Sequence, residues 1–102
     1  MTVNNFSATA TIALTDPMRL IRRLCKHWAH KLTTEYSDHS GSVDFGDQTI
    51  AKLYANENAT LTIEITAPTA TDLEKIESVV ARHIERMIPT EEISEIKWVQ
   101  SI

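Results

Sequence analysis

The chain has very little glycine, proline or cysteine. Its 102 residues include 2 Gly, 3 Pro and 1 Cys. So few helix- and strand-breaking residues predict a chain built mostly of regular elements joined by short turns. A single cysteine excludes an internal disulfide, so nothing in the sequence requires an oxidising compartment.

Long hydrophobic runs are also missing. No segment approaches the roughly 20 apolar residues of a membrane-spanning helix, and the N-terminus lacks the basic and apolar regions of a signal peptide. We therefore predict a cytoplasmic protein that does not enter a membrane. A chain of 102 residues can bury a core of its own, and we expect residues 1–102 to form a single α+β domain.

The sequence has no excess of positive charge. Its formal net charge is -4, which predicts no general attraction to nucleic acid or to an anionic membrane. The positive charges are nevertheless concentrated, because five of the ten Lys and Arg residues lie between positions 19 and 31. The segment 34–66 holds six acidic residues and only one basic residue. Acidic and basic side chains are therefore separated along the chain.

Apolar periodicity predicts the first elements. Residues 6–14 alternate between apolar and polar types, which is typical of a strand with one face in water. Asp16 and Pro17 then provide a helix start, with Asp as the N-cap and Pro in the first turn. Apolar residues recur at three- and four-residue spacing as far as Leu32, so we predict a helix over residues 17–31.

The remaining elements follow from turn and capping patterns. Three or four short strands, separated by turn residues, are predicted between positions 34 and 65. The capping pattern Thr71-Asp72-Leu73-Glu74 opens a second helix, which Pro89 ends, and ISEIKWVQ (93–100) is a final strand. The order β-α-β-β-β(-β)-α-β predicts an α+β fold, a two-layer sandwich of an antiparallel sheet with two helices on one face.

The stretch LCKHWAHK, residues 24–31, contains the only cysteine and two of the four histidines. On a helix with about 100° per residue, Cys25 falls beside the apolar stripe. Lys26 and His30 point to the opposite side, and His27 lies on the flank. The stretch therefore divides into an inward thiol and an outward basic surface.

The outward basic surface of this helix is the predicted ligand site. It consists of Arg19, Arg23, Lys26, His27 and His30. Clustered like charges repel one another unless an opposite charge answers them, and such clusters bind carboxylates, phosphates or acidic protein surfaces. We predict a non-enzymatic binding protein whose partner is an anionic small molecule or an acidic protein; the sequence specifies no cofactor. The alternative is a solvated helix face balanced by the acidic strands or by Glu91 and Glu92 after the second helix.

Three other functions stay open. One is a metal or haem site formed by His27 and His30 with His83 or Cys25, although zinc usually takes three or four protein ligands. Another is a thiol-dependent enzyme with Cys25 as nucleophile and His83 as base, which needs a lowered thiol pKa. The opposing interpretation makes Cys25 a buried core residue and His83 a boundary residue bonded to a carbonyl or to a neighbour such as Glu85. The last is a homodimer formed through an open sheet face or an edge strand.

Several stretches resemble a known family. They are LCKHWAHK, ATLTIEITA, VVARHIERM and EEISEIKWV, and together they run from about Ala8 to Val99. The chain is similar to the bacterial domain-of-unknown-function family numbered 2218. The resemblance implies a small bacterial α+β protein without an established activity, encoded near siderophore uptake or reduction genes, and so a link to iron or an iron-siderophore ligand. One departure is Met87, where an aromatic residue is expected.

Overall fold

The computed structural model describes residues 6–88 and 96–101. Its elements, in chain order, are β1 (Phe6–Ala13), α1 (Pro17–Trp28), β2 (Thr33–Tyr36), β3 (Ser40–Gly46), β4 (Thr49–Asn56), β5 (Thr60–Ala67), α2 (Ala70–Met87) and β6 (Val99–Ser101). The predicted α+β class and element order are confirmed, and the strand that the sequence left optional is present.

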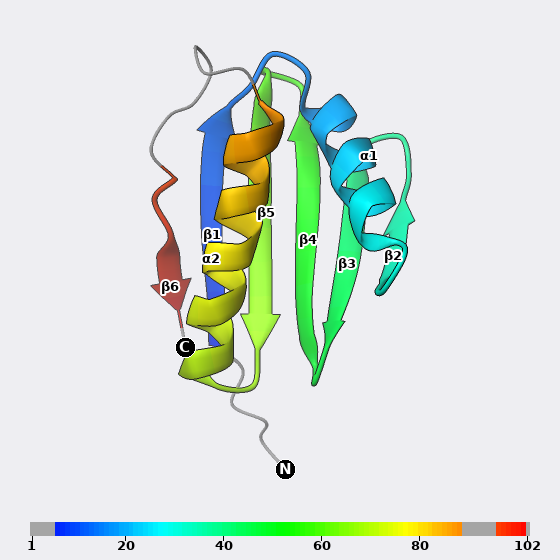
Figure 1. Cartoon of the computed structure of the whole chain (residues 1–102). Helices are drawn as coiled ribbons and strands as arrows, with labels where there is room; N and C mark the ends of the chain where they lie inside the picture. The colour runs from blue at the N-terminus through cyan, green and yellow to red at the C-terminus, as the bar shows by residue number, and fades with distance from the viewer. Residues whose placement is uncertain (1–5, 89–95, 102) are drawn as a thin grey trace.

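The strands form one antiparallel sheet in the order β2-β3-β4-β5-β1-β6. Strands β2 to β5 follow one another as a meander, whereas β1 lies between β5 and β6. Figure 1 shows both helices on one face of this sheet, with α1 over β2, β3 and β4 and α2 over β5 and β1. The opposite face, which we call the open face, is covered by neither α1 nor α2, the two helices of the described residues.

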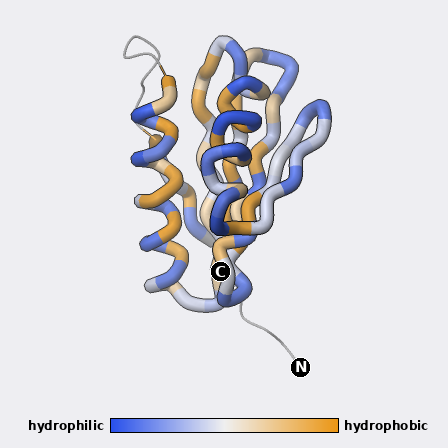
Figure 2. The backbone as a smooth tube through the Cα atoms, turned by 45° about the vertical axis from the view of Figure 1, so that its right-hand side comes forward, coloured by the Kyte–Doolittle hydropathy of each residue, from blue (hydrophilic) through white to orange (hydrophobic). Residues whose placement is uncertain are grey.

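The core lies between the helices and the sheet. On β5 the alternation is complete, with Leu61, Ile63 and Ile65 buried. The helices meet these side chains with their apolar stripes, which include Leu24 of α1 and Ile84 of α2. Figure 2 shows hydrophobic and hydrophilic positions alternating along both helices, as a one-sided burial requires. Each large apolar side chain buried in this way contributes about 1.5–3 kcal/mol.

Helix α1 is shorter than predicted. It ends at Trp28 and not at residue 31. The backbone amides of Lys31 and Leu32 both donate to the carbonyl of Trp28, at 3.1 and 2.8 Å. These two bonds close a turn that leads directly into β2, so the chain leaves the helix while Leu32 still packs against the core.

Helix α2 begins earlier than predicted, at Ala70. Its N-cap is Thr69, whose hydroxyl accepts a hydrogen bond from the amide of Asp72 at 3.1 Å. The predicted cap at Thr71 is therefore wrong by two residues. Two overlapping patterns, Thr69-x-x-Asp72 and Thr71-x-x-Glu74, compete here, and the first one also places an acidic residue in the first turn, where the helix dipole favours it.

The last strand is shorter than ISEIKWVQ. Strand β6 begins at Val99, so Ile96 and Trp98 precede it, packed against the core. The predicted strand residue Ile93 and the predicted helix stop Pro89 lie outside the described residues. Neither α1 nor α2, the helices within the described part of the chain, is long and apolar enough to cross a membrane.

Candidate anion-binding cleft

The two helices run in opposite directions, so the first turn of α1 lies beside the last turn of α2 (Figure 1). Asp16 fixes the start of α1, because its carboxylate accepts a hydrogen bond from the amide of Arg19 at 3.2 Å. A cleft of about 420 Å³ lies between these helix ends. Its lining residues are Leu14, Thr15, Asp16, Arg19, Leu20, Arg23, Arg86, Met87 and Ile88. We call it the arginine cleft.

Three arginine residues line the arginine cleft, namely Arg19, Arg23 and Arg86. Arg23 donates a hydrogen bond of 2.9 Å from Nη1 to the carbonyl of Met87. The carbonyls of a helix C-terminus lack intrahelical partners and carry partial negative charge, so this bond closes the end of α2. A guanidinium has five N–H donors in a fixed fork, and the bond to Met87 uses only one of them.

The cleft combines positive charge with apolar walls. Leu14 and Leu20 are buried, and Ile88 is half-buried. Arginine forks bind carboxylates and phosphates through paired hydrogen bonds, while apolar walls accept the non-polar part of a ligand. Among the described residues, the one carboxylate in the lining is that of Asp16, which is already engaged as the N-cap of α1. Glu91 and Glu92, the other acidic residues that could balance this charge, lie outside the described residues. The arrangement therefore suits a small anion that carries some apolar surface.

The predicted set of five basic residues is divided by the structure. Arg19 and Arg23 line the arginine cleft, whereas Lys26, His27 and His30 are exposed outside it. His30 lies in the turn after α1, because the helix ends at Trp28. The helix start at Asp16 and the basic flank of α1 were therefore located correctly, but the five side chains do not share one site.

The histidine of α2 lies against the end of α1. The ring of His83 is centred 5.0 Å from that of His27 and 4.8 Å from that of Trp28. Its Nδ1 lies 2.7 Å from the carbonyl of Val79. Because a carbonyl can only accept, Nδ1 carries the proton, and His83 is the predicted boundary histidine bonded to a carbonyl. Within residues 6–88 and 96–101, no three or more His, Cys, Asp or Glu residues gather as a metal would require.

Cys25 is part of the core, as its interpretation as a buried residue predicted. It is 1% exposed, and its Sγ donates weakly to the carbonyl of Glu35 at 3.7 Å. Burial raises the pKa of the Cys25 thiol above its ordinary value, and a backbone hydrogen bond at Ser42 acts in the opposite direction without cancelling this effect. A nucleophilic cysteine needs a lowered pKa, so the environment of this thiol works against the thiol-enzyme hypothesis.

Arg86 was not among the predicted site residues. It lies in the stretch VVARHIERM that resembles the family, but an arginine in the last turn of a helix is ordinary and does not by itself indicate a site. It reaches the cleft only because α2 ends where α1 begins. That relation depends on which strands are neighbours in the sheet, and strand alternation does not specify neighbours.

A six-stranded antiparallel sheet with two antiparallel helices on one face, and a cleft between the helix ends, places the chain among small two-layer α+β proteins. The chain belongs to the family described as "Uncharacterized protein conserved in bacteria (DUF2218)", which it matches over residues 9–99. It is similar to the NMR structure of PA4090 from Pseudomonas aeruginosa, with 33% sequence identity, a TM-score of 0.78, and coverage of 92% of this chain and 95% of that chain. No curated protein matches the chain.

Proposed function

We propose that the protein is a non-enzymatic binding protein whose arginine cleft holds a small carboxylate- or phosphate-bearing ligand. One observation carries the proposal: arginine residues from both helices, Arg19 and Arg23 of α1 and Arg86 of α2, line the same cleft. In a chain with a formal net charge of -4, such a local concentration of positive charge is a departure from the average surface.

The purely structural explanation accounts for only part of this concentration. Closing the C-terminus of α2 needs a donor at the Met87 carbonyl, and Arg23 supplies it. Arg19 and Arg86 bring two more positive charges to the same cleft. Like charges held together raise the free energy of the folded state unless an anion binds among them. A bound anion removes that cost, which is why we favour a ligand over a solvated surface.

The ligand class follows from the lining. Carboxylates and phosphates match the guanidinium fork, and Leu14, Leu20 and Ile88 offer apolar contact. The siderophore link implied by the family resemblance adds one member to this class, an iron complex held by carboxylate groups. Citrate, iron(III) citrate and inorganic pyrophosphate therefore form a suitable set of probes, since they separate the carboxylate, the iron complex and the phosphate.

The test is a titration of the ¹⁵N-labelled protein with each probe at low ionic strength, followed by amide chemical shifts. We expect saturable shifts at Arg19, Arg23 and Ile88 with at least one probe. Arg86→Ala should weaken that binding by about tenfold to a hundredfold, the usual worth of a charge-assisted hydrogen bond. Arg86 is preferred to Arg23 for this test, because Arg23 also holds the end of α2.

Arg22→Ala is the matched control. It removes the same charge from α1, but Arg22 is exposed and is not among the residues that line the cleft. We expect its affinity to stay within about twofold of the wild type, because exposed charges at a distance are screened. Equal weakening by both variants would show general electrostatic attraction and not a site. Absence of saturable shifts with all three probes would refute the proposal.

A further inference from the structure

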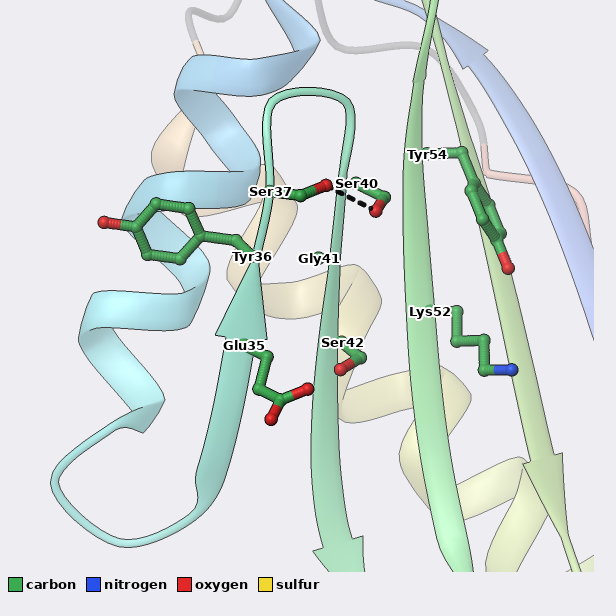
Figure 3. A pocket seen from close by; sticks show the side chains of 8 residues that line it. All are labelled: Glu35, Tyr36, Ser37, Ser40, Gly41, Ser42, Lys52 and Tyr54. Atoms are coloured by element: carbon green, nitrogen blue, oxygen red, sulfur yellow. Dashed lines mark hydrogen bonds between the residues drawn. The ribbon is translucent and has the colours of Figure 1, made fainter.

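A second hollow, of about 650 Å³, lies over strands β2, β3 and β4. Its lining residues are Glu35, Tyr36, Ser37, Ser40, Gly41, Ser42, Lys52 and Tyr54. Figure 3 shows Lys52 and Tyr54 projecting to one side of the sheet and Tyr36 projecting to the other side, where α1 lies. The polar side chains that project away from α1 lie on the open face, which neither α1 nor α2 covers. We call this site the hydroxyl hollow.

The strand register places the first row of polar groups. Glu35 of β2 pairs with Ser42 of β3, which pairs with Lys52 of β4. Paired residues on neighbouring antiparallel strands point to the same face, at a strand spacing of about 4.8 Å. A carboxylate, a hydroxyl and an ammonium therefore lie side by side in a straight row across three strands. Figure 3 shows the carboxylate of Glu35 next to the hydroxyl of Ser42.

The second row of polar groups lies two residues further along β3 and β4, on the same face of the sheet. Ser40 of β3 pairs with Tyr54 of β4, and the hydroxyl of Ser37 is hydrogen-bonded to that of Ser40 at 3.0 Å. Tyr54 is 39% exposed, so part of its side chain is accessible to a ligand. The two rows together offer three serine hydroxyls, a phenol, a carboxylate and an ammonium around one hollow.

Positive and negative side chains in and beside the hollow balance one another. Lys52 pairs with Glu64 of β5 on one side. On its other side it pairs with Ser42, which in turn pairs with Glu35. Opposite charges at paired positions of a sheet attract, which leaves little net field in the hollow. A strongly charged anion would be repelled by the carboxylates of Glu35 and Glu64, and a strongly charged cation would be repelled by Lys52. The lining favours a ligand that is electrically neutral and rich in hydrogen-bonding groups.

We propose that the hydroxyl hollow binds a neutral polyhydroxylated small molecule, namely a sugar of one or two rings. Sugar hydroxyls both donate and accept, so they match a lining in which serine, carboxylate and ammonium groups alternate. The C–H face of a sugar ring packs on an aromatic ring, and Tyr54 supplies one. A volume of about 650 Å³ is also of the size usual for small-ligand sites, roughly 300–1,000 Å³.

The experiment uses glucose, N-acetylglucosamine and maltose as probes, with ¹⁵N-labelled protein and concentrations up to about 100 mM, a range that detects weak affinities. We expect saturable amide shifts at Ser42, Lys52 and Tyr54 with at least one of the sugars. Tyr54→Ala should weaken binding by roughly tenfold, through loss of the aromatic contact. Glu35→Gln changes an exposed side chain without altering its shape and should weaken the same binding severalfold.

Glu74→Gln is the control, matched to Glu35→Gln, because Glu74 is an exposed carboxylate of α2 and is not among the residues that line the hollow. Its affinity for the sugar should equal that of the wild type within about twofold. The proposal is overturned if none of the three sugars gives saturable shifts, or if the shifts lie outside the hollow. It is also overturned if the zwitterion triglycine binds there and the sugars do not, or if Glu74→Gln and Glu35→Gln weaken binding equally.

Discussion

At the scale of single residues, Gly41 marks the closest approach of α1 to the sheet. A Cβ atom at this position would lie 2.5 Å from Cγ2 of Ile21 and 3.2 Å from Sγ of Cys25. Gly41 is a buried position within β3. Its role is to let the helix pack closely, and this role has no local signature because it depends on a residue twenty positions away.

Gly41→Ala should therefore destabilise the protein by about 1–3 kcal/mol, the usual cost of forcing an extra methyl group into a packed core. Urea unfolding followed by circular dichroism measures this loss. In an Ile21→Ala background, which removes the atom nearest to the new methyl group, the same substitution should cost much less. An equal cost in both backgrounds would contradict the steric explanation and point instead to the backbone of β3.

At the scale of elements, the sequence predicted well which segments form helices and which form strands. It predicted the first and last residues of the helices less well. The alternation of Leu61, Ile63 and Ile65 and the helical stripe of Leu20, Leu24 and Trp28 are local patterns, and each became the expected element. The ends of the helices depend on which of several nearby groups makes a hydrogen bond. At the end of α1 that group is the Trp28 carbonyl, which takes two amides of the following turn.

The start of α2 provides a test at this scale, because two threonines compete for the N-cap. Thr69→Ala should lower the free energy of unfolding by about 1 kcal/mol, since it removes the acceptor for the Asp72 amide. Thr71→Ala changes an exposed residue inside the helix and should alter stability by less than about 0.5 kcal/mol. Thermal unfolding of the two variants side by side measures the difference. A larger loss from Thr71→Ala would restore the cap that the sequence first suggested.

At the scale of the whole molecule, both candidate sites depend on strand order. The basic flank of α1 was predicted, since Arg19 and Arg23 lie four residues apart on one helix. Arg86 joins them only because β1 and β5 are antiparallel neighbours, which makes α2 end beside the start of α1. The hydroxyl hollow likewise needs the register that pairs Glu35 with Ser42 and Ser42 with Lys52. Alternation predicts which face a side chain takes, but it does not predict its neighbours across the sheet.

Cys25 lies between the helix layer and the sheet, so the ionisation of its thiol reports how tightly the two layers pack. The thiol is almost completely buried against β2 and β3, near the carbonyl of Glu35 and under Gly41. Burial raises its pKa in the folded protein above the ordinary value of 9.0, which the unfolded chain restores. Below that value both states keep the proton, so the thiol adds no pH dependence. Above it the unfolded state loses the proton first, and folding becomes less favourable as the pH rises.

We therefore expect the free energy of unfolding of the wild type to fall above about pH 9, by up to about 1.4 kcal/mol per pH unit from this thiol. Lysine and tyrosine side chains also titrate in this range, so the measurement is the difference between the wild type and Cys25→Ala in urea unfolding at pH 7, 8, 9 and 10. The difference should be constant up to pH 8 and then shrink, because only the wild type carries the thiol. A difference in free energy of unfolding that stays constant across all four pH values would contradict this prediction. It would mean that the thiol ionises as easily in the folded protein as in the unfolded chain, so that Cys25 is not buried between the layers.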